Sequence, residues 1–266
     1  MIDLKTKIYD LNGNMRGEIE LPRAFNTPYR PDIIKRAVLS LQSLRRQPYG
    51  TDPLAGKRTS AHYHGLRHYR WRMMGVEMSR MARLHGKIGH LMWRARFVPQ
   101  AVKGRKAQPP KAEKKWEQKI NKKEMLLAFK SALSACCNLE FVTKSGHHFQ
   151  GDLPVIVEDS FEKIKKTDDA LKVLKILGFE KELERGKEKK IRAGKGKERN
   201  RKYKKKKSLL VVVSQDCNVL KALKNLAGVD VCFVNDLNVE LLAPGCNAGR
   251  LALFTKSALE MLGKMK

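Results

Sequence analysis

The fold is decided by five consecutive apolar residues, Leu209-Leu210-Val211-Val212-Val213. A continuous apolar run rich in β-branched residues predicts a strand buried on both faces, as in a parallel sheet covered by helices. Strands and helices alternate around it: we expect strands at 154–157, 230–234 and 251–254, helices at 167–177 and 218–226, and a last helix capped by Thr255 that ends before Gly263. This alternation predicts an α/β fold, a doubly wound, mainly parallel sheet domain in three layers.

Residues 1–47 supply further elements of the same globular domain. Two short strands, Lys5–Tyr9 and Gly17–Leu21, are joined through the turn-forming sequence Asn12-Gly13-Asn14. A helix then begins at Pro31, because the apolar residues that follow it recur at helical spacing.

The charge of the chain is far from balanced. Among 266 residues, 56 are Lys or Arg and 27 are Asp or Glu, which gives a net charge of +29. Self-repulsion on this scale opposes compaction unless a polyanion is bound, and nucleic acid is the natural candidate. No membrane partner is expected, because no apolar run approaches the roughly 20 residues of a spanning helix. The N-terminal residues predict no secretory signal, so we expect the protein to stay inside the cell.

The five cysteines are Cys136, Cys137, Cys217, Cys232 and Cys246. Their number is odd, their neighbours are apolar and no C-x-x-C spacing occurs, so neither disulfides nor a zinc site is indicated. We expect buried or partly buried thiols.

Residues 48–119 interrupt the globular pattern with a long basic insertion. Glu77 is its only acid between Asp52 and Glu113. We expect that the insertion cannot bury its own apolar groups and is ordered by a bound partner. The cations proposed to contact RNA are Lys57, Arg58, Arg67, Arg70, Arg72, Arg80, Arg83, Lys87, Arg94, Arg96, Lys103, Arg105 and Lys106. The aromatic residues proposed to stack on bases are Tyr63, Tyr69, Trp71, Trp93 and Phe97. A disordered basic loop without specific docking is the alternative.

Beyond the insertion the chain resumes a helical pattern, in which Asn121 is the expected N-cap and Glu124 completes a capping box. A second basic segment, residues 183–207, lies between two core elements and not at a terminus. This position favours a bound polyanion over a solvated tail. Its RNA-contacting candidates are Arg192, Lys195, Lys197, Arg199, Arg201 and Lys202.

Histidines in the insertion raise the question of a metal site. They are His62, His64, His68, His85 and His90. Their spacing matches none of the common zinc patterns, so we expect no metal there and interpret these residues as contacts to RNA or solvent. Nucleotide cofactors are also disfavoured, because Gly194-x-Gly196 is too short for a dinucleotide motif.

Candidate catalytic residues are few. Ser214, Asp216 and Asp159 follow predicted strands, where open α/β sheets bind ligands. Helix capping and loop geometry explain these residues at least as well, and we expect no enzyme. The rival hypotheses are an RNA-processing or RNA-modifying enzyme with an α/β catalytic domain, and a DNA-compacting chromosomal protein.

Several long and irregular motifs carry a family resemblance. They are Pro53-Leu54-Ala55-Gly56-Lys57-Arg58-Thr59, Arg94-Ala95-Arg96-Phe97-Val98-Pro99-Gln100-Ala101-Val102-Lys103-Gly104-Arg105-Lys106, Lys190-Ile191-Arg192-Ala193-Gly194-Lys195-Gly196, and Leu242-Ala243-Pro244-Gly245 leading to Gly249-Arg250-Leu251. In these motifs the chain resembles the archaeal form of the universal large-subunit ribosomal protein four family.

This resemblance implies a structural constituent of the large ribosomal subunit, in the cytoplasm, with ribosomal RNA, other large-subunit proteins and the nascent polypeptide as partners. It implies a globular α/β domain made by residues 1–47 and 120–266, and an extended loop, 48–119, that reaches the nascent-peptide exit tunnel. Residues 183–207 are then a second segment in contact with ribosomal RNA. The residues that match the loop tip, and so the candidates for lining the tunnel, are Met81, Arg83, Leu84, His85 and Gly86.

Overall fold

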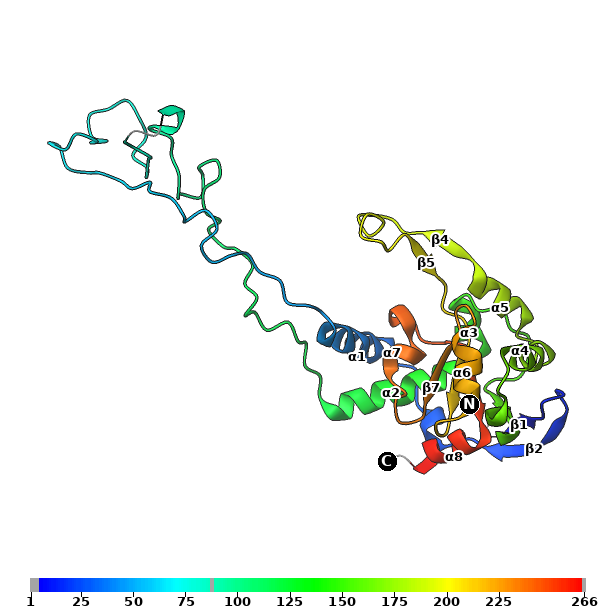
Figure 1. Cartoon of the computed structure of the whole chain (residues 1–266). Coiled ribbons are helices and arrows are strands. Elements are labelled where there is room, and N and C mark those ends of the chain that lie inside the picture. Colours follow the sequence, from blue (N-terminus) through cyan, green and yellow to red (C-terminus); the bar gives the residue numbers. More distant parts are fainter. Residues whose placement is uncertain (1–4, 87–88, 265–266) are drawn as a thin grey trace. The chain divides into compact units, whose positions relative to one another are not determined.

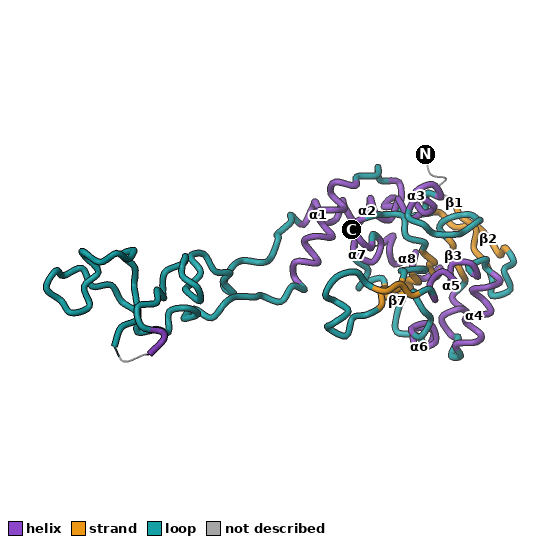
Figure 2. The backbone as a smooth tube through the Cα atoms, turned by 90° about the horizontal axis from the view of Figure 1, so that it is seen from above, coloured by secondary structure: helices purple, strands orange, loops and turns teal. Residues whose placement is uncertain are grey.

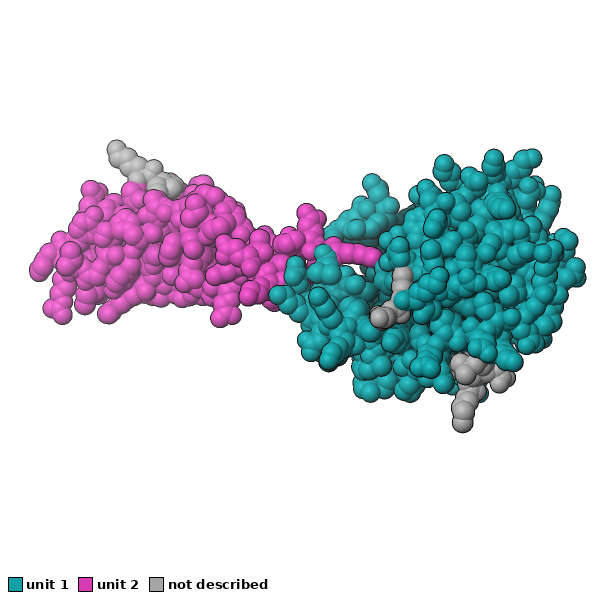
Figure 3. Space-filling view, turned by 90° about the horizontal axis from the view of Figure 1, so that it is seen from below, with its two compact units in different colours: residues 1–44, 117–266 teal, residues 45–116 magenta. Residues whose placement is uncertain are grey.

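The structure is a computed structural model that describes residues 5–86 and 89–264. It divides into two compact units, residues 1–44 with 117–266 and residues 45–116 (Figure 3). The second unit thus begins at residue 45, where 48 was expected, and ends at 116, where 119 was expected. Two hydrogen bonds explain why the second unit ends before residue 118. Ser40 Oγ donates to the Gln118 carbonyl at 2.5 Å, and Gln118 N donates to Ser43 Oγ at 2.9 Å. Residue 118 is therefore held by the helix that precedes the second unit.

The first unit is built on a six-stranded sheet in the order β2-β1-β3-β8-β6-β7 (Figure 1). The strands are β1 (Lys5–Tyr9), β2 (Met15–Glu20), β3 (Val155–Val157), β6 (Leu210–Val213), β7 (Asp230–Phe233) and β8 (Ala252–Thr255). Within this sheet, β1 and β2 pair antiparallel through the predicted turn, and the other described neighbours run parallel. The register places Val211 opposite both Leu253 and Val231. The predicted mainly parallel sheet is confirmed.

Helices cover this sheet on both faces. They are α1 (Pro31–Leu44), α2 (Lys122–Cys136), α3 (Leu139–Lys144), α4 (Thr167–Ile176), α5 (Glu180–Lys187), α6 (Asn218–Lys224), α7 (Val239–Leu242) and α8 (Lys256–Lys264). Short 3-10 turns are η1 (Arg23–Asn26), η2 (Gly89–Leu91), η3 (Asp159–Lys163) and η4 (Pro244–Cys246). Among the described residues, no helix is long and apolar enough to cross a membrane.

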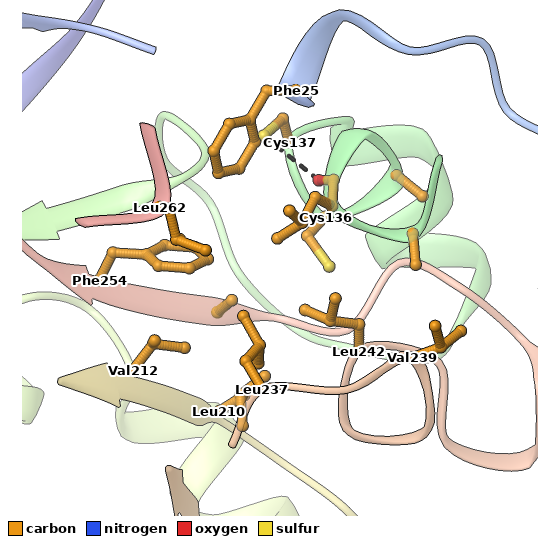
Figure 4. Packing of buried hydrophobic residues seen from close by; sticks show 14 of the residues in the cluster. Phe25, Cys136, Cys137, Leu210, Val212, Leu237, Val239, Leu242, Phe254 and Leu262 are labelled. Carbon is orange, nitrogen blue, oxygen red and sulfur yellow. Dashed lines mark hydrogen bonds between the residues drawn. The ribbon is translucent and has the colours of Figure 1, made fainter. Parts of the chain in front are cut away.

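Two hydrophobic cores flank the sheet because successive side chains of a strand point to opposite faces. Leu210 and Val212 belong to the core with α1, α2, α7 and α8, whereas Val211 and Val213 belong to the core with α4 and α6. Figure 4 shows the first core, in which Phe254 of β8 meets Phe25 edge-on at 5.9 Å. Burial of all four residues of β6 agrees with the pattern that decided the fold.

The cysteines are free thiols, as expected. Cys136, Cys137 and Cys232 are buried, and Cys217 and Cys246 are partly buried. Burial raises the pKa of Cys136 to about 12, so this thiol stays protonated and packs as an apolar group (Figure 4).

Two local predictions at helix ends are wrong. Asn121 occupies the N-cap position of α2, but its side chain makes no capping hydrogen bond. Glu124 instead pairs with Arg36 of α1 at 3.4 Å, so a contact between helices replaces the capping box. At the other end of the chain, α8 continues through Gly263 to Lys264. Its N-terminus agrees with the prediction, because Thr255 Oγ1 accepts from Ala258 N at 3.4 Å.

The second unit is almost entirely loop (Figure 2). In the part that the structure describes, its regular structure is limited to η2 and two isolated antiparallel bridges, His62 with Arg83 and Arg83 with Ala95. Its two ends run side by side, since Thr51 N donates to the Pro110 carbonyl at 3.0 Å and the Tyr49 and Trp116 rings lie 4.6 Å apart.

Candidate nucleic-acid interface

The basic segment 183–207 forms the end of α5 followed by a two-stranded antiparallel hairpin, β4 (Lys189–Ile191) and β5 (Tyr203–Lys205) (Figure 1). Its register sets Lys189 opposite Lys205 and Lys190 opposite Lys204. Like charges directly opposite each other destabilise a strand pair, and an isolated hairpin is marginal even without them. All residues of both strands are exposed. The hairpin therefore presents a concentrated positive charge that a bound anion would stabilise.

The six cations predicted in this segment all lie in the turn region of the hairpin and are all exposed. Arg192 is oriented by the backbone on the opposite side of the hairpin: its Nε donates to the Arg201 carbonyl at 3.1 Å, and its main-chain N donates to the Lys202 carbonyl at 2.8 Å. Gly194 and Asn200 adopt positive φ values of 78° and 60°, which bend the chain between the strands. The structure thus brings the predicted cations of this segment together on one hairpin.

A buried ionic network anchors the hairpin to the core of the first unit. Glu182 of α5 is fully buried and accepts hydrogen bonds from His147 Nδ1 at 2.7 Å and from Arg185 Nε at 2.9 Å. Although burial alone would raise the pKa of Glu182, the bonds from His147 and Arg185 outweigh it and lower that pKa to about 2. Arg185 Nη2 also donates to the Lys207 carbonyl at 2.7 Å, which ties α5 to the strand that leaves the hairpin.

A second ionic contact anchors the chain near Lys207, where it leaves the hairpin. Arg250 is 1% exposed; its Nη2 donates to Asp230 Oδ2 at 2.6 Å and its Nε donates to the Ser208 carbonyl at 3.1 Å. Asp230 also pairs with Lys207 at 2.8 Å. Burial raises the pKa of Asp230, but Arg250 and Lys207 together hold it below its usual value. Neither anchor is evident in the sequence, because a single acid or arginine gives no local signal.

Most of the predicted RNA-contacting cations of the second unit are exposed, namely Lys57, Arg58, Arg67, Arg70, Arg72, Arg80, Arg94, Lys103 and Lys106. Arg83, Arg96 and Arg105 are half-buried, and Lys87 lies outside the described residues. Arg58 is ion-paired with Asp52 and lowers the pKa of that carboxyl. Apart from Arg58, the exposed side chains are therefore available to a partner, whereas Arg58 and the half-buried arginines contact residues of the unit itself.

Arg83 differs most from its predicted role. Its Nη1 donates to the Trp93 carbonyl at 2.8 Å, and its Nη2 donates to Ser79 Oγ at 2.9 Å and to the Ser79 carbonyl at 3.0 Å. The planar guanidinium thus joins two segments of the loop, a geometry that an ammonium group cannot reproduce. Arg83 holds the loop together and has little donor capacity left for phosphate.

Aromatic residues of the second unit also contact each other. The ring of Trp71 lies 5.7 Å from Trp93 and 5.5 Å from His85, and the ring of Tyr69 lies 4.3 Å from His64. Tyr63 is 47% exposed and Phe97 is 38% exposed. Tyr69 is 42% exposed as well, but its ring already lies against His64, so Tyr63 and Phe97 are the better placed for a base among the five predicted stacking residues.

The expectation that this segment cannot bury apolar groups is wrong at two positions. Met73 is 1% exposed and Leu84 is 7% exposed. Backbone hydrogen bonds surround them: Met73 N donates to the His64 carbonyl at 3.2 Å, and Trp93 N donates to the Leu84 carbonyl at 2.7 Å. Leu84 is therefore not placed to line a tunnel, in contrast to Met81 and Gly86, which are partly exposed.

Three of the five histidines meet in space, which the sequence spacing did not predict. His62, His64 and His85 each direct one ring nitrogen to a common point, with these atoms within 4.8 Å of one another. His68 and His90 are exposed and lie outside this group. The three side chains therefore contact one another, which the interpretation as separate contacts to RNA or solvent did not include.

The residues at the strand ends that were weighed for catalysis have structural roles. Ser214 Oγ donates to Glu162 Oε1 at 3.0 Å, as does Thr255 Oγ1 at 2.7 Å. Asp159 Oδ1 accepts from Ser257 N at 2.8 Å and so caps the start of α8. Asp216 is exposed. These contacts join η3, β6, β8 and α8, and they account for Ser214 and Asp159 without a catalytic function.

The chain matches known proteins over nearly its whole length. The model of the ribosomal protein L4/L1 family matches residues 19–265. The chain is 50% identical over 262 residues to the large ribosomal subunit protein uL4 of Archaeoglobus fulgidus, which covers 98% of this chain and 99% of that protein. It is 49% identical to the protein of the same name from Methanocaldococcus jannaschii, over 97% and 98% of the two chains. The counterpart from Nanoarchaeum equitans is 47% identical, over 99% of each.

Proposed function

Because this chain belongs to the ribosomal protein L4/L1 family, we propose that it is a structural constituent of the large ribosomal subunit that binds and stabilises ribosomal RNA. The observation that carries the proposal is the β4–β5 hairpin, where lysines face lysines on exposed strands anchored to the core. Such a surface is unfavourable in the free chain and favourable on a phosphate backbone. No catalytic role is proposed, and the partners are ribosomal RNA and neighbouring ribosomal proteins.

The second unit is proposed as the other RNA-contacting surface. Its exposed arginines suit bidentate phosphate contacts, and Tyr63 and Phe97 suit stacking on unpaired bases. Phe97 has a φ of 70°, an unusual conformation for an aromatic residue that is typical of functional positions. We retain residues 48–119 as the RNA-bound segment and 183–207 as the second such segment of the globular domain.

The test is co-sedimentation of the full chain with large subunits at increasing salt. In the test variant, Lys189, Lys190, Lys204 and Lys205 are replaced by Gln. Loss of four phosphate contacts should lower the slope of log affinity against log salt by about 3. The matched control replaces four exposed lysines elsewhere, Lys165, Lys166, Lys221 and Lys224, by Gln and should leave the slope nearly unchanged. Equal effects of both sets would refute a specific role for the hairpin.

A finer proposal concerns the nascent polypeptide. We infer that residues near Met81 and Gly86, which are partly exposed, approach the peptide exit tunnel, whereas the side chain of Leu84 is buried and does not. A stalled nascent chain that carries a photocrosslinking residue should form crosslinks to peptides containing residues 80–86. Crosslinks confined to other parts of this chain, or their absence at every linker length, would contradict the proposal.

A further inference from the structure

The three clustered histidines converge through one ring atom each. His85 Nε2 lies 2.9 Å from His64 Nε2 and 2.9 Å from His62 Nε2. His62 and His64 are two residues apart on an extended stretch, so their side chains lie on the same side. The isolated bridge between His62 and Arg83 brings His85 to them across a separation of more than 20 residues. Tertiary structure, not sequence spacing, therefore assembles the group.

The other ring nitrogens show where the protons are. His62 Nδ1 lies 2.9 Å from the Ser60 carbonyl oxygen, and His85 Nδ1 lies 3.1 Å from the Arg83 carbonyl oxygen. A carbonyl oxygen only accepts, so each of these Nδ1 atoms carries a hydrogen and donates it. A neutral imidazole protonated at Nδ1 has a lone pair at Nε2. The Nε2 atoms of His62 and His85 thus direct two lone pairs at each other.

Two lone pairs at this distance require a cation between them, either an extra proton or a metal ion. One extra proton can bridge only two of the three Nε2 atoms, whereas a metal ion can accept a lone pair from all three. Zinc has Zn–N distances of about 2.0–2.1 Å, which in a tetrahedron separates ligand nitrogens by about 3.4 Å. Opening each 2.9 Å contact by about half an ångström would admit the ion.

We propose that His62, His64 and His85 bind one divalent transition-metal ion, with zinc as the best fit. Imidazole nitrogen is a preferred ligand of zinc, copper and nickel, whereas magnesium and calcium require oxygen. Ligation through Nε2 with Nδ1–H donated to a carbonyl is also the arrangement that orients histidines in metal sites. Three protein ligands leave the fourth position to water.

The surroundings of the cluster assign the ion a structural role. The rings of Tyr69 and Trp71 flank His64 and His85 at 4.3 Å and 5.5 Å, and thereby shield the ligands. An ion held by residues 62, 64 and 85 closes the loop that contains Met73 and Leu84, and it removes conformational freedom from that loop. This inference does not depend on RNA binding, because it concerns the second unit alone.

The test is calorimetric titration of zinc chloride into the full chain after dialysis against a chelator. We expect one saturable zinc ion per chain, and four-coordinate absorption bands when cobalt replaces zinc. His85→Ala should weaken binding at least about tenfold, since even changes outside the ligand set weaken metal sites by about 10–100-fold. The matched control, His68→Ala with His90→Ala, removes two exposed histidines outside the cluster and should bind like the original chain.

A second measurement keeps the proposal open to refutation if His85→Ala fails to fold. Zinc should slow proteolysis between residues 62 and 85 in the original chain and in the control. His64→Gln, a milder change, should lose that protection while its circular dichroism remains unchanged. Absence of saturable zinc binding by the original chain would overturn the proposal. So would binding that survives replacement of all three histidines and disappears when the cysteines are alkylated.

Discussion

The β4–β5 hairpin and the 45–116 unit are both strongly basic, yet they are held in shape by different means. The hairpin buries none of its strand residues and depends on the core through Glu182, Arg185 and Arg250. The 45–116 unit is organised internally, by the Arg83 guanidinium and by packing around Met73. A strongly basic segment can therefore be held in shape either by its attachment to a folded core or by contacts within the segment itself. We therefore expect different substitutions to destabilise the two regions.

The largest effect is expected at Arg250. Arg250→Met keeps most of the buried volume but removes the buried one of the two partners of Asp230 and the donor to the Ser208 carbonyl. Leaving a buried ion pair without one partner costs about 3–5 kcal/mol, so the free energy of unfolding of the first unit should fall by about 3 kcal/mol in urea titrations. Lys207→Met is the control, because this exposed partner of Asp230 should contribute less than about 1 kcal/mol. Similar losses for both would mean that burial of Arg250 is not the source of its effect.

The next effect depends on pH. The pKa of Glu182 is about 2 in the folded chain against an ordinary value of 4.5. A lowered folded pKa means stability that is present above pH 4.5 and is lost as the pH falls toward 2. The loss should reach up to about 3 kcal/mol in the original chain, since one pKa unit corresponds to about 1.4 kcal/mol.

Glu182→Gln should be less stable than the original chain at neutral pH and should lack this part of the acid dependence. The measurement is the urea midpoint between pH 2 and 6. In the same series, the hairpin should become more sensitive to protease as Arg185 loses its partner. Parallel pH profiles for the two chains would contradict the anchoring role of Glu182.

A smaller and local effect is expected at Arg83. Arg83→Lys preserves the charge but loses the fork that reaches Trp93 and Ser79 at once. Amide exchange should accelerate across residues 79–96 by about tenfold, which corresponds to about 1.4 kcal/mol, with no change in the first unit. Arg80→Lys, at an exposed position, should leave exchange unchanged. Equal amide exchange rates in both variants would mean that Arg83 acts only as a surface cation.

The smallest effect distinguishes folding from binding. Lys204→Glu converts the Lys190–Lys204 pair into an opposite-charge pair and should stabilise the free hairpin by about 0.2–1 kcal/mol, seen as slower amide exchange. The same change should weaken association with large subunits, because it reverses a charge on the proposed RNA surface. Lys221→Glu on α6 is the matched control. Weaker exchange protection in Lys204→Glu would show that the cross-strand repulsion is unimportant.

Much of the fold could be predicted because the signals are local. The β6 run, the helical spacing after Pro31 and the turn at Gly13 each act within a few residues, and the structure confirms them. The predictions at helix ends were less successful. At the start of α2 the Arg36–Glu124 ion pair replaced the expected capping box, and at the end of α8 the helix continued through Gly263.

The sequence by itself determined the doubly wound sheet and the excess of positive charge, since both follow from which residue types stand at which spacing. Only the tertiary structure decided which side chains that are distant in the sequence contact one another. Arg83, an expected RNA contact, donates hydrogen bonds within the second unit. Leu84 is buried, and His85 lies beside His62 and His64. The physical reason is that hydrogen bonds and metal ligation depend on distances of about 2–3 Å, which are set by chain crossings far apart in the sequence.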